Sequence, residues 1–150
     1  MRTYQRLSEL QALAGTHLGT SDWQDIDQAR IDQFAAVTGD DQWIHVDQAR
    51  AAAGPFGATL VHGHLTLSLL PVMVRTAFTV ADVRMSVNYG LNRVRFPAPV
   101  PVGSRLRGCF KLMTFETIAG GAQLIVEVTM EREGHHKPVC VAESVVRHFV

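Results

Sequence analysis

The sequence has little cysteine, no excess of charge of either sign and no long apolar run free of polar residues. Its 150 residues include two cysteines, Cys109 and Cys140, whose spacing matches no CxxC motif. The count alone allows one disulfide, but two isolated thiols in an apolar chain favour small buried side chains in a reducing compartment. The first residues lack the apolar run of a signal peptide, so we expect a cytoplasmic protein.

The balanced charge and the interrupted apolar segments argue against two classes of partner. Fourteen Lys and Arg residues balance fourteen Asp and Glu residues, which argues against a nucleic-acid-binding surface and against a polybasic membrane patch. The most apolar long stretch, residues 61–80, contains His62, His64, Pro71 and Arg75. Since a bilayer-spanning helix needs about 20 apolar residues with few charges, we expect a core helix there and no membrane partner.

Helical patterns dominate the first half of the sequence. Asp27 is a suitable N-cap for the apolar pattern over residues 28–38, and Gly39 is a suitable end for that helix. With 47% hydrophobic residues, 19% charged residues and no repeat, we expect one domain over residues 1–150. We expect helices over residues 7–14, 28–38, 47–53 and 61–78, the last kinked or broken at Pro71, and a strand over residues 18–26.

The second half of the sequence has the apolar alternation that is typical of strands. Pro- and Gly-rich turn signals separate the strands, so helices followed by strands indicate an α+β fold with an antiparallel sheet. A helix that is apolar on nearly all sides needs a curved sheet around it. We expect strands over residues 85–89, 91–96, 104–114, 123–133 and 137–149.

The stretch FAAVTGDDQWIHVD, residues 34–47, places a carboxylate and an imidazole five residues apart just beyond a helix end. Loops on a rigid scaffold commonly hold functional groups. The unperturbed pKa of histidine lies near neutrality, so Asp40 and His45 can share the protons of one water. The alternative is that Asp40 caps backbone amides and His45 is an ordinary turn residue. Spacing alone favours this alternative, because such residues are common near loops.

The order of residues in this stretch resembles the signature of MaoC-like, (R)-specific enoyl-CoA hydratases. The signature contains an aromatic residue, a Ser/Thr-Gly-Asp segment and an apolar residue followed by His. This sequence supplies Phe34, Thr38-Gly39-Asp40 and Ile44-His45. Gln42-Trp43 replaces the usual Asn-Pro, which resembles the branch that includes nodulation protein N and mycobacterial hydratases. Further segments that resemble the family are residues 56–57 and 60–63, ahead of the central helix, and 88–90, 95–100 and 103–104, beside the substrate tunnel.

The resemblance implies a hot-dog fold, in which an antiparallel sheet wraps around a long central helix and two subunits pair edge to edge. It implies syn addition of water to trans-2-enoyl thioesters, giving (R)-3-hydroxyacyl thioesters, or the reverse dehydration, in fatty acid metabolism. Asp40 and His45 would hold the water, and Gly63 would offer a backbone N–H to the thioester oxygen. The expected substrate is a coenzyme A or acyl-carrier-protein thioester, with no cofactor, and the expected assembly is a homodimer. The residues expected to bind the substrate are Leu60, Val61, His62, Gly63, Ser86, Val87, Asn88, Tyr89, Pro97, Ala98 and Pro99.

Other interpretations stand beside the hydratase. A hot-dog thioesterase would place a carboxylate on or near the central helix, and residues 61–78 contain no Asp or Glu. A non-catalytic acyl-binding or signalling protein could share the fold, but it would not need the pair of Asp40 and His45. His62 and His64 do not share a helix face, so we expect no metal. The arginines that suit the phosphates of coenzyme A are Arg93, Arg95, Arg105 and Arg107, although exposed strand arginines are the default explanation.

Overall fold

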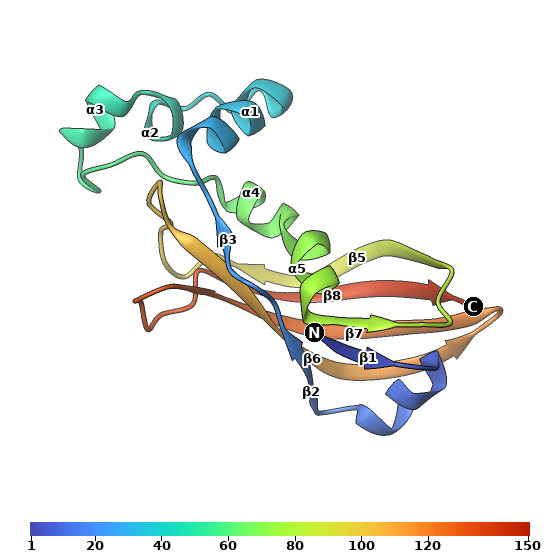
Figure 1. The fold of residues 1–150 in the computed structure, drawn as a ribbon. Coiled ribbons are helices and arrows are strands. Elements are labelled where there is room, and N and C mark those ends of the chain that lie inside the picture. The colour runs from blue at the N-terminus through green and yellow to red at the C-terminus, as the bar shows by residue number, and fades with distance from the viewer.

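A six-stranded antiparallel sheet curves around a central helical segment in the computed structural model, which describes residues 1–150 (Figure 1). The strand order is β2-β6-β7-β8-β5, and the short β3 also pairs with β6. Only β5 and the β2–β3 side lie at the edges of this sheet. The strands are β2 (His17–Thr20), β3 (Gln24–Asp25), β5 (Met85–Arg95), β6 (Arg105–Ile118), β7 (Gly121–Arg132) and β8 (Cys140–Phe149).

The central helical segment consists of two helices in line, α4 (Gly63–Ser68) and α5 (Leu70–Ala77). The predicted break at Pro71 is confirmed, because proline has no N–H to continue the helical hydrogen bonds. One side of the segment packs on the concave face of the sheet, where the apolar alternation of β6, β7 and β8 supplies the core. Large core residues at this contact are Leu69, Met73, Phe110, Leu112, Leu124 and Met130.

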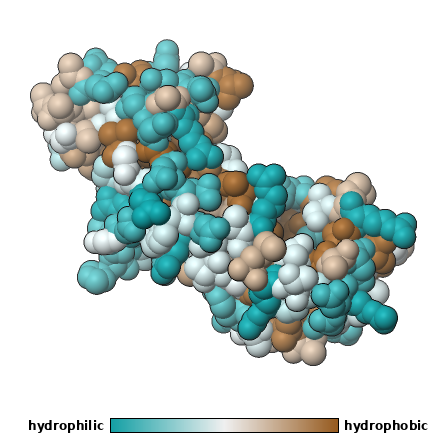
Figure 2. Space-filling view, viewed as in Figure 1, coloured by the Kyte–Doolittle hydropathy of each residue, from teal (hydrophilic) through white to brown (hydrophobic).

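Three short helices form a lobe beyond one end of the sheet, which we call the overhang (residues 28–52; Figures 1 and 2). They are α1 (Gln28–Thr38), α2 (Trp43–Val46) and α3 (Gln48–Ala52). As the sequence predicts, Asp27 caps α1 by accepting the Arg30 N–H at 2.9 Å, and Gly39 ends it with a φ of 76°. A left-handed φ suits glycine because it has no Cβ. The sequence did not indicate α2.

Several boundaries differ from the predictions for physical reasons. The expected strand over residues 18–26 is two short strands, β2 and β3, on either side of Ser21. The expected strands over 85–89 and 91–96 are one strand, β5, with register shifts beside Gly90. An extra residue in one strand bends the ladder without ending it. A 3-10 helix, η1 (Leu7–Leu13), and a parallel pair of β1 (Arg2–Tyr4) with β4 (Phe78–Val80) complete the fold.

The arrangement agrees with the hot-dog fold that the resemblance implies, with the overhang joined to the sheet by β3 and to α4 by residues 53–62. None of the helices combines the length and the apolar character that crossing a membrane requires.

Candidate active site

His45 lies on α2 and is 8% exposed. Its Nδ1 lies 2.7 Å from the carbonyl oxygen of Leu60, in the segment that leads to α4. A carbonyl only accepts hydrogen bonds, so Nδ1 bears the proton and Nε2 keeps its lone pair. The backbone strengthens the contact, because the Leu60 N–H donates to the Ile44 carbonyl at 2.8 Å. The neutral imidazole is therefore held in the tautomer that can act as a base.

Gln28, on α1, and Thr59, in the segment before α4, support α2. The Gln28 side chain donates to the His45 carbonyl at 2.8 Å. The Thr59 hydroxyl in turn donates to the amide oxygen of Gln28. Nothing in the sequence pattern marks either contact, because they join residues 17 and 31 positions apart.

His62 is stacked on His45. The two ring centroids are 3.7 Å apart, and the ring planes differ by 22°. The ring of Phe34, on α1, packs on His62 with a centroid distance of 5.0 Å. His62 is 1% exposed, and its Nε2 lies 2.9 Å from the main-chain oxygen of Asp40. The His62 ring is therefore buried in contact with the rings of both His45 and Phe34.

Asp40 follows Gly39 at the end of α1 and is exposed, in contrast to His45. One polar atom of each of the side chains of Asp40, His45 and His62 lies within 4.8 Å of the other two. Two hydrogen bonds of about 2.8 Å that meet at a near-tetrahedral angle span roughly 4.6 Å. The carboxylate of Asp40 and the imidazole of His45 are thus close enough to bind one water between them.

The pKa of His45 is lower than that of an ordinary histidine. Burial is the largest cause, because it disfavours the charged imidazolium. The hydrogen bond to Leu60 acts in the opposite direction, His62 lowers the pKa further, and Asp40 raises it. The net shift favours a neutral His45 near pH 7.

The group of Asp40, His45 and His62 has the residue types of a metal site but a poor geometry for one. A metal ion lies in the plane of each imidazole that binds it, and two stacked rings with centroids 3.7 Å apart and planes that differ by 22° have no common point close to both rings. Each imidazole also has one nitrogen at hydrogen-bond distance from a carbonyl. The arrangement suits a bound water better than an ion.

Gly63 is the first residue of α4 and follows His62 directly. The first N–H groups of a helix lack acceptors within the helix, and the helix dipole favours negative charge there. A Cβ at position 63 would lie 3.0 Å from the ring of Phe96. Glycine therefore allows an aromatic side chain to approach this turn.

A groove runs between α5 and the sheet, on the side of the edge strand β5, and we call it the α5–β5 groove. It consists of a cavity of about 320 Å³ and a second hollow of about 390 Å³ that begins at His64. The two share Leu70, Pro71, Asn88 and Ser144. The apolar lining of the cavity includes Leu70, Val74, Phe78, Phe110, Val128 and Val146.

Comparison with known proteins identifies the family. Residues 9–135 match the family described as MaoC like domain. The chain belongs to the MaoC-like family. 3-Hydroxyacyl-thioester dehydratase Z of Mycobacterium tuberculosis is 53% identical over 149 residues, 99% of each chain. Nodulation protein N of Rhizobium leguminosarum bv. viciae is 45% identical over 141 residues, 91% of this chain and 86% of that one.

Solved structures confirm the hot-dog fold. The R-hydratase PhaJ1 from Pseudomonas aeruginosa, in its unliganded form, has a TM-score of 0.74 and 22% identity. The match covers 97% of this chain and 86% of that chain. The predicted resemblance to MaoC-like proteins, and to the branch with nodulation protein N and mycobacterial relatives, is confirmed.

The predicted substrate-binding residues of this MaoC-like chain fall into separate places. Leu60 and Val61 are buried next to His45 and α4, and the Val61 N–H donates to the Val100 carbonyl at 2.8 Å. Ser86 and Asn88 line the α5–β5 groove, and Tyr89 lines its second hollow. Val87 is exposed on β5 and lines neither part. In the turn after β5, Pro97 is half-buried, Ala98 is buried and Pro99 is exposed.

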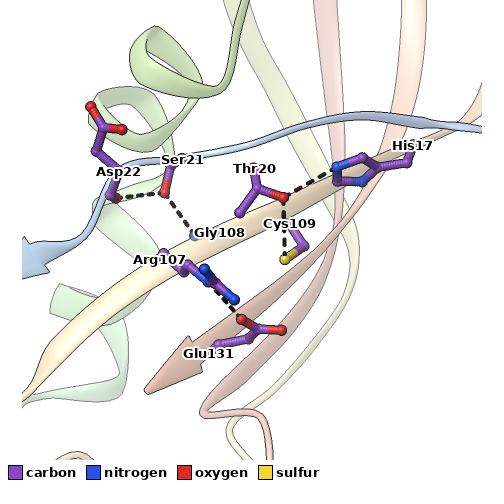
Figure 3. A network of polar contacts seen from close by, with 8 residues as sticks. All are labelled: His17, Thr20, Ser21, Asp22, Arg107, Gly108, Cys109 and Glu131. Carbon is purple, nitrogen blue, oxygen red and sulfur yellow. Dashed lines mark hydrogen bonds and ion pairs between the residues drawn. The ribbon is translucent and has the colours of Figure 1, made fainter. Parts of the chain in front are cut away.

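Three of the four candidate arginines are engaged within the chain. Arg105 pairs with Asp25 at 3.1 Å and Glu133 at 2.9 Å. Arg107 pairs with Glu131 at 2.7 Å on the outer face of the sheet (Figure 3). Arg95 donates to the Val94 carbonyl at 2.7 Å. Arg93 makes no ion pair and no side-chain hydrogen bond.

Both cysteines are free thiols. Cys109 lies beside Thr20 on the outer face of the sheet, with 3.7 Å between the hydroxyl and the sulfur (Figure 3). Burial raises the pKa of Cys109, and it raises the pKa of Cys140 to about 11. Neither thiol is poised as a nucleophile, because the thiolate is the reactive form.

Proposed function

We propose that this MaoC-like protein is an (R)-specific enoyl thioester hydratase, which adds water to trans-2-enoyl thioesters and catalyses the reverse dehydration. The observation that carries the proposal is the placement of the Asp40 and His45 side chains within reach of one water. The relative at 53% identity is named as a 3-hydroxyacyl-thioester dehydratase, and that reaction is the reverse of the proposed hydration.

Asp40 and His45 would act together on the bound water. As the water oxygen bonds to the β-carbon, the pair takes one proton from the water. The electrons of the double bond move toward the thioester oxygen, which gives an enolate. The pair then returns a proton to the α-carbon from the same side, so that H and OH add to one face. General acid–base catalysis of this kind contributes about 10²–10⁴-fold to a rate.

The Gly63 N–H would stabilise the enolate oxygen. It lies at the start of α4, where N–H groups lack helical acceptors, and it follows the residue that is stacked on His45. Hydrogen bonds to a developing oxyanion are worth more than hydrogen bonds to a ground-state carbonyl. The water supplies both the hydroxyl group and the proton that add, and the protein groups are regenerated, so the proposal includes no cofactor and no metal.

The acyl chain would lie in the α5–β5 groove. The groove begins near the start of α4, at His64, and its cavity is lined largely by apolar side chains from α5 and the sheet. Leu60, Val61, Ser86, Asn88, Tyr89 and the turn at Pro97–Pro99 would surround the thioester and its pantetheine arm. Both a coenzyme A thioester and an acyl-carrier-protein thioester contain this arm.

A homodimer would complete the groove. Strand β5 pairs only with β8, and its other edge is free. Along this edge Met85, Val87, Tyr89 and Leu91 are all exposed. A long free edge with apolar side chains is a template for strand pairing, and a two-fold axis pairs the same edge of two copies. Light scattering on the purified protein tests this, because a monomer would contradict it.

The function is tested with crotonyl-CoA. Adding the protein should lower the absorbance of the conjugated enoyl thioester and yield (R)-3-hydroxybutyryl-CoA on chiral analysis. A thiol reagent in a parallel reaction detects free coenzyme A, which a thioesterase would release. An unchanged absorbance with crotonyl and longer enoyl thioesters would contradict the proposal.

The second candidate is a non-catalytic acyl-binding protein, because one relative, nodulation protein N, has a name that states no enzyme activity. Such a protein would bind the enoyl thioester in equilibrium dialysis without any change in absorbance. The retained pair of Asp40 and His45, oriented by hydrogen bonds to Leu60 and Gln28, favours the enzyme.

A further inference from the structure

His62 contacts both members of the proposed catalytic pair. Its ring is stacked on the ring of His45 at 3.7 Å, and its Nε2 lies 2.9 Å from the main-chain oxygen of Asp40. Since that oxygen only accepts, Nε2 bears the proton and donates. One side chain therefore joins α2, the end of α1 and the start of α4.

His62 is enclosed by the protein. It is 1% exposed, and the Phe34 ring packs on it at a centroid distance of 5.0 Å. Its Nδ1 is buried and has no hydrogen-bond partner within the protein, and the same holds for the Thr66 hydroxyl one turn along α4. A neutral ring with one proton on Nε2 meets the contacts that exist.

The stacking also couples the two rings electrostatically, because His62 is one of the causes that lower the pKa of His45.

We infer that His62 is a positioning residue, which fixes the separation of Asp40 and His45 by stacking on one and hydrogen bonding to the main chain of the other. The inference rests on the proposed function. Asp40 itself is exposed and follows a glycine, so its carboxylate needs such a restraint. A displacement of about 1 Å in reacting groups can cost roughly 10²-fold in rate.

Two substitutions separate the two contacts. His62→Phe keeps an aromatic ring against His45 and removes the N–H that Asp40 accepts. His62→Gln keeps an N–H donor at a similar reach and removes the ring. Thr66→Val is the matched control, because Thr66 is also 1% exposed on α4 and its hydroxyl makes no hydrogen bond.

The measurements are kcat and KM with crotonyl-CoA, together with thermal unfolding of each variant. We expect His62→Phe to lower kcat about 100-fold with KM changed less than about threefold. His62→Gln should recover part of this loss, and Thr66→Val should keep nearly the kcat of the unchanged protein. If His62→Phe does not fold, His62→Gln is compared with Thr66→Val alone, and a loss of about tenfold is expected.

Several outcomes would overturn the inference. An unchanged kcat in the His62 variants would show that His62 does not position the pair. A raised KM with an unchanged kcat would make His62 a binding residue. A loss of kcat in Thr66→Val equal to that in His62→Phe would indicate an effect of packing alone. An inactive unchanged protein would refute the proposed function instead. An active protein with normal His62 variants would refute only the positioning role.

Discussion

The overhang end of the molecule and the α5–β5 groove differ in how their polar groups are held. At the overhang end, His45 and His62 are buried, and each has a main-chain carbonyl at hydrogen-bond distance. In the groove, Arg75, Ser86 and Asn88 are exposed, and β5 has a free edge. The chemical groups are thus held within one chain, whereas the groove has an open side, which the proposed homodimer would complete.

The largest expected effect is at the overhang end. Asp40→Asn and His45→Gln should each lower kcat for crotonyl-CoA by about 10²–10⁴-fold, because each removes a proton-transfer group. The substitutions are close in size, so the thermal unfolding curve should keep its shape. Steady-state absorbance assays check the rate. Near-normal turnover in either variant would show that another residue has the catalytic role and that the reacting groups do not lie at the overhang end.

Gly63 offers a pair of variants that differ in one N–H. Gly63→Pro removes the N–H, and the first turn of a helix tolerates proline. The preceding His62 has a ψ of 138°, which suits a residue before proline. Gly63→Ala places the same Cβ against Phe96 and keeps the N–H. We expect a loss in kcat of about 10²–10³-fold in the proline variant relative to the alanine variant, and equal rates would exclude an oxyanion role.

A smaller and more selective effect is expected in the groove. Val74→Phe should fill part of the cavity that Val74 lines. Each methylene that loses its buried site costs about 0.8 kcal/mol, so two or three lost methylenes lower kcat/KM roughly tenfold to fiftyfold. The assay compares crotonyl-CoA with a long-chain enoyl-CoA. A loss of kcat/KM for the long-chain substrate alone would support binding of the acyl chain in the groove. An equal loss of kcat/KM for both substrates would contradict it.

The smallest effect is in the pH dependence. The pKa of His45 is below its unperturbed value of 6.5, mainly because of burial. Below pH 6.5 the unfolded chain therefore binds more protons, so this group destabilises the fold as the pH falls from 6.5 toward the lowered pKa. The acid limb of kcat/KM should have its midpoint below 6.5 for the same reason. A midpoint at or above 6.5 would show that a charged His45 is favoured instead.

The sequence predicted the parts of the site that depend on local patterns. The caps at Asp27 and Gly39 and the break at Pro71 were readable, because each depends on neighbours in the chain. Asp40, His45 and Gly63 were singled out only by the resemblance to the MaoC-like signature. The stacking of His62 on His45 was not readable, because it joins residues 17 positions apart through the packing of α2 against the start of α4. For the same reason, α2 itself and the contacts of Gln28 were missed.

The central claim is that Asp40 and His45 act on one shared water, and the double variant tests it most directly. When two groups act as a unit, removal of the second costs little after the first is gone. We predict that kcat of Asp40→Asn/His45→Gln for crotonyl-CoA is close to that of the less active single variant. Losses in kcat that multiply in the double variant would show two independent roles and contradict the claim.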